Sequence, residues 1–150
     1  MGDRCYLEIE FSRNDLPRFN EILKDKLWDG VFWDEENGDE LKVVAVVYEA
    51  NYGWYDEIRA LARAGLTFTV YHGAGGAYGP CVYACYKGDL VGCSADCDGN
   101  PVVPVTRGSL HKVAYQDCLK YWKLVEKIEI ETKQHTKEVD HEDNASTVQG

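Results

Sequence analysis

Hydrophobic and polar side chains alternate near the start of the chain, so that every second residue from Cys5 to Phe11 is apolar. A period of two is typical of a strand with one buried face, and it predicts a strand over residues 5–11. From Leu16 the apolar residues recur every three or four positions, which predicts a short amphipathic helix. Two strand-like runs then flank Asn37-Gly38, a pair that favours a tight turn, so the pattern predicts a β-hairpin.

The same order of elements continues after this hairpin. A turn leads into a helix with Ile58 and Leu61 on one side, Gly65 ends that helix, and another strand follows. The order β-α-β-β-α-β is that of the ferredoxin-like split motif, in which one antiparallel sheet carries both helices on a single face. A further hairpin over residues 81–95 and a helix from Ser109 complete the predicted α+β fold.

Length and composition predict a single domain over residues 1–131, because a chain of 150 residues with 45% hydrophobic side chains is large enough for one core. Residues 132–150 are polar and lack periodicity, so we expect a disordered C-terminal tail. No apolar run reaches the roughly 18 residues of a membrane span, and the first residues lack the pattern of a secretory signal. We therefore expect a cytoplasmic protein without a membrane partner.

The formal charge of −10 is concentrated in the N-terminal half, where residues 1–70 hold 15 acidic and 8 basic side chains, a balance of −7. A surface of this sign repels nucleic-acid phosphates and anionic membranes. We therefore expect no direct binding of nucleic acid and a basic protein surface as the partner. The sequence leaves the oligomeric state open.

The densest cluster of this charge is residues 28–40, which we name the acidic hairpin. It holds six carboxylates and no basic residue, with tryptophans among them. Aromatic side chains anchor protein interfaces and carboxylates attract a basic partner, although a charge run is more commonly a solvated surface. The ligand spacing of a calcium loop is missing, so no metal is assigned. The predicted partner-binding residues are Trp28, Asp29, Trp33, Asp34, Glu35, Glu36, Asp39 and Glu40.

A second candidate site combines a glycine-rich loop with an aromatic segment. Residues 71–80, YHGAGGAYGP, match neither the dinucleotide fingerprint nor a P-loop. Consecutive amides of such a loop can still bind an anion, and the alternative is a mobile connection between strands. Residues 48–55, YEANYGWY, have the composition of a ligand pocket, or else cap the core. The predicted ligand-binding residues are Tyr48, Glu49, Asn51, Tyr52, Trp54, His72, Gly73, Gly75, Gly76 and Tyr78.

The cysteines and histidines form no clear metal or catalytic constellation. On one strand Cys81 and Cys85 would stand about 13 Å apart, too far to chelate one zinc ion. The alternatives are pairing with Cys93 and Cys97 across the hairpin, or burial as small apolar residues. His72 and Cys81 are conceivable as base and nucleophile, but their spacing does not require contact. We therefore assign no catalytic residue and no cofactor, and favour a non-enzymatic protein with reduced thiols.

In composition alone, a small, acidic, aromatic-rich α+β domain is similar to the proteins with which phages and plasmids inhibit host nucleases, some of which mimic the charge of DNA. This resemblance implies an inhibitor that binds a nucleic-acid-handling defence complex, and it assigns no residues. The assignment of the acidic hairpin as the binding surface comes from its own charge and tryptophans. The alternative is a small-molecule or nucleotide-binding domain, including a small enzyme, with its site at the loop 72–80. A structural component of an assembly is a third alternative, and its sign would be a large interface between copies.

Overall fold

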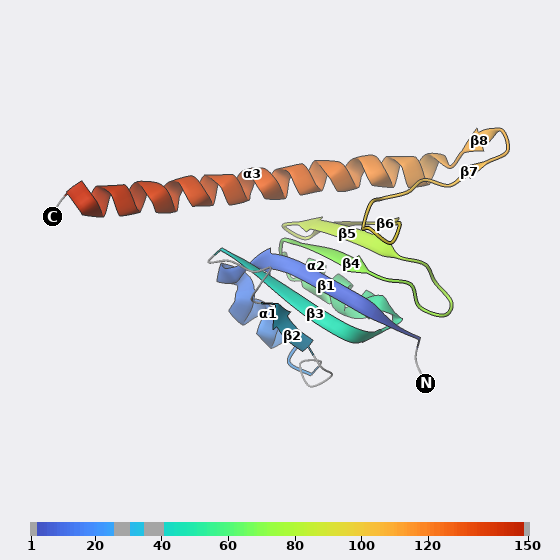
Figure 1. The fold of residues 1–150 in the computed structure, drawn as a ribbon, viewed down its shortest axis with the longest axis horizontal. Coiled ribbons are helices and arrows are strands. Elements are labelled where there is room, and N and C mark those ends of the chain that lie inside the picture. The colour runs from blue at the N-terminus through green and yellow to red at the C-terminus, as the bar shows by residue number, and fades with distance from the viewer. Residues whose placement is uncertain (1–2, 26–30, 35–40, 149–150) are drawn as a thin grey trace.

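The computed structural model describes residues 3–25, 31–34 and 41–148, and it describes side chains outside residues 31–34 and 135–148. The described part forms a six-stranded antiparallel sheet with two short helices on one face and one long helix on the other (Figure 1). In chain order the elements are β1 (Arg4–Ser12), the 3-10 turn η1 (Arg13–Asp15), α1 (Leu16–Ile22), β2 (Val31–Asp34), β3 (Lys42–Asn51), the 3-10 turn η2 (Tyr52–Trp54), α2 (Tyr55–Arg63), β4 (Phe68–His72), β5 (Cys81–Tyr86), β6 (Asp89–Ser94), β7 (Val105–Thr106), β8 (Ser109–Leu110) and α3 (Lys112–Val148).

The strand order is β2-β3-β1-β4-β5-β6, and every neighbouring pair is antiparallel. The middle of β1 lies between two partners, because Ile9 is opposite Ala45 of β3 and Val70 of β4. The predicted α+β fold with an antiparallel sheet and a C-terminal helix is confirmed. The ferredoxin-like topology stays a prediction.

The face that packs on α1 and α2 is named the first face, and its buried cluster the first core. Alternation along β1 turns Leu7 and Ile9 into this core, where both are completely buried, and turns Glu8 and Glu10 to the opposite face. The first core consists of Cys5, Leu7, Ile9, Phe11, Phe19, Leu23, Val43, Ala45, Val47, Ala50, Trp54, Ile58, Leu61, Ala62, Leu66, Phe68, Val70 and Cys85.

The opposite face is named the second face, and α3 packs there on β5 and β6 (Figure 1). Its buried cluster, the second core, consists of Val82, Ala84, Val91, Cys93, Ala95, Cys118, Tyr121 and Leu124. The spacing of the three helical residues, 118, 121 and 124, places them along one side of α3. The second core therefore joins one hairpin to one side of one helix.

Both predicted hairpins are present. Strands β2 and β3 pair with Phe32 opposite Val46, although the Asn37-Gly38 turn lies outside the described residues. Strands β5 and β6 are joined by Lys87 and Gly88, which have φ angles of 49° and 90°. Positive φ at both central residues is the requirement of a type I′ turn, which matches the twist of the strands.

Helix α3 begins later than the sequence predicted and continues further. Ser109 lies opposite Thr106 in the small β7–β8 hairpin, so it does not cap the helix. His111 takes that role, because its Nδ1 accepts a hydrogen bond of 3.1 Å from the Ala114 amide. The helical backbone extends to Val148, through the segment predicted as a tail. No helix in the described ranges has the length and apolar character needed to cross a bilayer.

Candidate functional site

A cavity of ≈ 560 Å³ opens on the first face, where β4, β5 and β6 reach the turn before α2. We name it the tyrosine pocket. Four tyrosine rings and one imidazole line it together with small residues. The lining residues are Tyr52, Tyr55, His72, Tyr78, Gly79, Pro80, Cys81, Tyr83, Ser94 and Ala95.

A left-handed turn builds one wall of this pocket. Tyr52, Gly53 and Trp54 have consecutive φ angles of 50°, 63° and 55°. For the two aromatic residues this conformation costs about 1 kcal/mol or more each, and such strain persists only where the surrounding structure holds it. The turn sends Trp54 into the first core at 2% exposure and leaves Tyr52 at 60% exposure beside the cavity.

Asp3 ties this turn to the glycine-rich loop on the other side of the pocket. Its carboxylate accepts hydrogen bonds from the amides of Gly76, at 2.6 Å, and Ala77, at 2.7 Å. Its carbonyl oxygen accepts bonds from the Tyr52 amide, at 2.7 Å, and the Tyr78 hydroxyl, at 3.3 Å. The loop amides thus form the anion-binding nest that the sequence suggested, but the bound anion is a carboxylate of the same chain.

His72 is the one buried polar side chain of the described core, at 5% exposure, and its ring lines the pocket. Its Nδ1 lies 2.9 Å from the Gly73 carbonyl oxygen. Since a carbonyl oxygen only accepts, Nδ1 carries the hydrogen in this contact. Gly53 packs over the imidazole ring, where a Cβ would lie 3.1 Å from both Cδ2 and Nε2. A side chain at position 53 would therefore displace the imidazole.

Three side chains of the pocket, Tyr78, Tyr83 and Cys81, have raised pKa values. Burial raises the pKa of Tyr78 and of Tyr83 well above the ordinary phenol value, with neighbouring thiols adding to both shifts. Burial likewise raises the pKa of the Cys81 thiol, despite a hydrogen bond from Tyr83. His72 lies opposite Cys81 in the β4–β5 register, but a thiol with a raised pKa is a poor nucleophile.

Part of the predicted ligand set converges on this pocket. Tyr52, His72 and Tyr78 line it, and Gly73, Gly75 and Gly76 belong to the loop beside it. Gly75 has no room for a side chain, because a Cβ would lie 2.5 Å from the Tyr78 ring and 2.6 Å from the Asp3 carboxylate.

The rest of the predicted ligand set lies elsewhere. Trp54 belongs to the first core. Tyr48 is 63% exposed on β3 and contacts the ring of Tyr6. Glu49 forms an ion pair of 2.7 Å with Arg4, and Asn51 is exposed at the end of β3. These three residues do not line the pocket.

The predicted ligand set lacks Asp3 and seven lining residues: Tyr55, Gly79, Pro80, Cys81, Tyr83, Ser94 and Ala95. Of these, Cys81 was considered from the sequence as a nucleophile beside His72. Tyr83 alternates with buried residues of β5, so the strand pattern could have predicted that it lies on the pocket side. Its ring covers Gly92 directly across the hairpin, where a Cβ would lie 2.6 Å from the ring. Asp3 gave no local signal, because its partners lie more than 70 positions away in the sequence.

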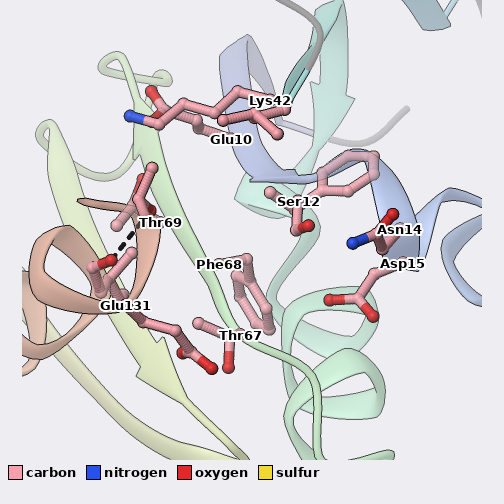
Figure 2. A pocket seen from close by; sticks show the side chains of 13 residues that line it. Glu10, Ser12, Asn14, Asp15, Lys42, Thr67, Phe68, Thr69 and Glu131 are labelled. Atoms are coloured by element: carbon pink, nitrogen blue, oxygen red, sulfur yellow. Dashed lines mark hydrogen bonds and ion pairs between the residues drawn. The ribbon is translucent and has the colours of Figure 1, made fainter. Parts of the chain in front are cut away.

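A second cavity of ≈ 350 Å³ lies at the end of the sheet beneath α3, and we name it the sheet-end cavity (Figure 2). Figure 2 shows the side chains of Asp15 and Glu131 on opposite sides of the Phe68 ring. Burial raises the pKa of the Asp15 carboxyl; the Arg18 guanidinium opposes this shift and the Glu131 carboxylate adds to it. At the rim, Lys42 forms an ion pair of 2.9 Å with Glu10.

Most of the acidic hairpin falls outside the described part of the chain, which includes none of Trp28, Asp29, Glu35, Glu36, Asp39 and Glu40. Trp33 and Asp34 lie in β2, at the edge of the sheet, and their backbones pair with Ala45 and Val44. The partner-binding role of the hairpin stays a prediction.

All six cysteines are free thiols, as expected, and the alternative of pairing across the β5–β6 hairpin is absent. Cys81 lies opposite Ser94, and Cys93 lies opposite Val82 on the second face. Burial and the adjacent Cys118 thiol raise the pKa of Cys93 to about 12. Among the described residues, no three histidine, cysteine or carboxylate side chains group as metal ligands.

Comparison with known proteins returned no match: no family model, no curated protein and no solved structure is similar to this chain.

Proposed function

We propose that the protein binds a small organic molecule with a flat, neutral or cationic ring in the tyrosine pocket. The observation that carries this proposal is the convergence of four tyrosines and His72 on one cavity whose two sides are tied together by Asp3. The cavity volume of ≈ 560 Å³ falls within the range of small-molecule sites. Strained backbone at Tyr52 and Trp54 supports the same conclusion, because such strain clusters at ligand sites.

The lining chemistry narrows the ligand class. None of the residues lining the pocket is lysine or arginine, and Asp3 already occupies the amides of the glycine-rich loop. A phosphate or carboxylate group would therefore find no cationic partner there. Aromatic faces favour stacking with a planar ring and contact with an organic cation. With His72 Nδ1 hydrogen-bonded to the Gly73 carbonyl, Nε2 is the polar ring atom left to contact a ligand.

The test is a thermal-shift screen of planar heterocycles and methylated amines, followed by calorimetry on each compound that raises the melting temperature. Tyr52→Ala should weaken binding about tenfold, since one stacking contact contributes about 1.4 kcal/mol. Tyr48→Ala is the matched control, because Tyr48 is exposed to nearly the same extent, 63% against 60%, but lies outside the pocket. Equal affinity of the two variants for every compound found would overturn the proposal.

A second candidate function is binding of a basic partner surface through the acidic hairpin, as an inhibitor of a nucleic-acid-handling complex encoded by a phage or plasmid. The net charge of −10 and the position of β2 at the sheet edge favour it. An edge strand can pair with an extended segment of a partner, and neighbouring carboxylates attract a basic one.

Capture of partners from host lysate at low and high salt tests this second candidate. Reversing Asp34, Glu35 and Glu36 to lysine should abolish retention of a basic protein at low salt. The control reverses three exposed acids elsewhere, Glu21, Asp25 and Asp98, and should retain it. Retention by both triple variants would exclude the acidic hairpin as the binding surface.

We infer in addition that β1 to β4 with α1 and α2 form a ferredoxin-like unit, extended by the β5–β6 hairpin. The partial order β2-β3-β1-β4, with antiparallel neighbours, supports this assignment. Burial of Phe19 from α1 and Ile58 from α2 in one core also supports it, because the split motif carries both helices on the same face.

A further inference from the structure

Helix α3 has a second apolar side that faces away from the sheet. Tyr115, Leu119 and Trp122 follow one another at intervals of four and three residues, and they are 45%, 45% and 53% exposed. At 3.6 residues per turn these positions form one stripe, centred about 120° around the helix from the side that holds Cys118, Tyr121 and Leu124. Trp122 borders that side, since its ring centroid lies 5.3 Å from that of Tyr121. Exposed aromatic and leucine side chains grouped in this way mark an interaction surface.

The β7–β8 hairpin extends this surface beyond the start of the helix, where Figure 1 shows it projecting from the end of α3. We name it the arm. Its strands have two residues each, and its cross-strand pair, Val105 and Leu110, is 74% and 45% exposed. An isolated hairpin of this size is only marginally stable in water. Packing against a further surface would stabilise it.

Charge distinguishes this surface from the rest of the molecule. Residues 105–134 carry six basic side chains and four acidic ones, a balance of +2, so the remaining residues carry −12. A basic partner is attracted to the acidic surfaces outside this segment, and a partner that is acidic overall, a second copy included, is repelled unless its acidic part is held away. A second copy can bind residues 105–134 if the acidic domains of the two copies are kept apart.

An antiparallel arrangement of two α3 helices meets this condition. With Leu119 at the centre of a two-fold axis, Tyr115 lies opposite Trp122 of the second copy, and Lys112 lies opposite its Glu126. The arm then reaches the turn that contains Ile130 of the second copy, a residue that is 48% exposed in this chain. Each sheet lies on the outer side of its own helix. Two helix diameters of about 10 Å each separate the sheets, which exceeds the screening length of about 8 Å at physiological salt.

We propose that two copies of the chain associate through an antiparallel pair of α3 helices centred on Leu119, with each arm on the helix of the other copy. Aromatic and leucine contacts provide the association, and the Lys112–Glu126 pairs select the antiparallel direction. This proposal concerns a surface separate from the tyrosine pocket, and it stands or falls independently of ligand binding.

Sedimentation velocity over a concentration series tests the association. The wild-type chain should change from monomer to dimer in the micromolar range, and Trp122→Glu should weaken dimerisation at least a hundredfold. Tyr48→Glu, which places the same charge at another exposed aromatic residue, should leave the dimer unchanged. A wild-type chain that stays monomeric at about 100 μM would overturn the proposal. If such a monomer instead bound anionic vesicles through Trp122, a membrane surface would be the partner of the exposed stripe.

A charge exchange tests the orientation. In a dimer of Lys112→Glu, both pairs between positions 112 and 126 consist of two acids. In a dimer of Glu126→Lys, both pairs consist of two bases. Each variant should therefore dimerise about tenfold more weakly than wild type. An equimolar mixture of the two variants should restore dimerisation, because both pairs are then opposite in sign. Failure of the mixture to recover, or unchanged dimerisation of either single variant, would exclude the antiparallel arrangement.

Discussion

The first face of the sheet packs on two short helices that are interleaved with its strands, whereas the second face packs on one long helix at the end of the chain. The first core draws on β1, β3, β4 and β5 together with α1 and α2. The second core draws only on the β5–β6 hairpin and its flanking residues, and on one side of α3. The same sheet therefore has one face that fixes the fold and one that attaches an additional element.

The two proposed functional surfaces, the tyrosine pocket and the exposed stripe of α3, also lie on opposite faces of the sheet. The tyrosine pocket lies on the first face, where strained backbone and the Asp3 contacts are supported by a large core. Helix α3 presents its exposed stripe from the second face, held by far fewer buried side chains. Local opening is easiest where few apolar contacts are lost, so we expect α3 to open without unfolding of the first core.

Truncating a leucine in the first core should produce the larger loss of stability. Leu61 of α2 is completely buried. Leu61→Ala should lower the free energy of unfolding by about 3–4 kcal/mol, through lost burial and the cavity left behind. Urea denaturation followed by circular dichroism measures this, and the elements of the first core should lose their structure in one transition. A loss below about 1 kcal/mol would show that the first core repacks readily.

The same substitution in the second core should have a smaller and more local effect. Leu124 of α3 is 3% exposed, but its cluster is smaller. We expect Leu124→Ala to cost about 2 kcal/mol and to speed hydrogen exchange across α3 while β1 and β4 keep their protection. Leu119→Ala, at a dilution where the chain is monomeric, is the exposed-leucine control and should change neither quantity. Equal effects of Leu124→Ala and Leu61→Ala on all strands would show that the two cores unfold as one.

The first face was largely predictable from sequence because its signals are local. Alternation along β1 and the helical spacing of Ile58 and Leu61 each place apolar residues on one side within a few positions. Such periods fix which side of each element is buried, and the elements then have few ways to pack. The runs on either side of Asn37-Gly38 also pair as strands, but Asp34 lies opposite Val44 and not opposite Leu41, the partner that uninterrupted pairing from a two-residue turn at Asn37-Gly38 would give it.

The tyrosine pocket was only partly predictable because it depends on contacts between distant residues. Asp3 meets Gly76 and Ala77 across more than 70 positions, and no local pattern reports such a partner. The positive φ of Trp54 was also hidden, because bulky residues disfavour that conformation and only the packed core enforces it here. The sequence therefore found the aromatic segment but not which of its side chains line the cavity.

The end of α3 shows a different limit. Residues 132–148 lack the apolar stripe that marks a packed helix, and the sequence accordingly predicted a tail. A helix that has already begun adds residues at little cost, and glutamate, lysine and glutamine have good helix propensity. The backbone therefore continues as helix to Val148 without the signal that would predict it.

The smallest predicted change in the free energy of unfolding is at the sheet-end cavity, where the two helical layers approach each other. The pKa of Asp15 is raised chiefly by burial, so the folded state holds this proton more tightly than the unfolded chain. Stability should therefore fall as pH rises from the ordinary carboxyl value of about 3.9 through the raised folded value. Asp15→Asn removes this titration, so the variant should gain stability over wild type at neutral pH and lose that advantage in acid.

Paired urea denaturation of wild type and Asp15→Asn at neutral and acidic pH measures this difference, which should be well below either leucine effect because the carboxyl is partly solvated. Glu131→Gln is the matched probe from the α3 side. Since the Glu131 carboxylate adds to the raised pKa of Asp15, removing its charge should reduce the gain from Asp15→Asn. If Asp15→Asn instead destabilises the protein at neutral pH, attraction to Arg18 outweighs burial at this site. If Asp15→Asn gave the same gain in stability with and without Glu131→Gln, α3 would be too far from Asp15 for their charges to interact.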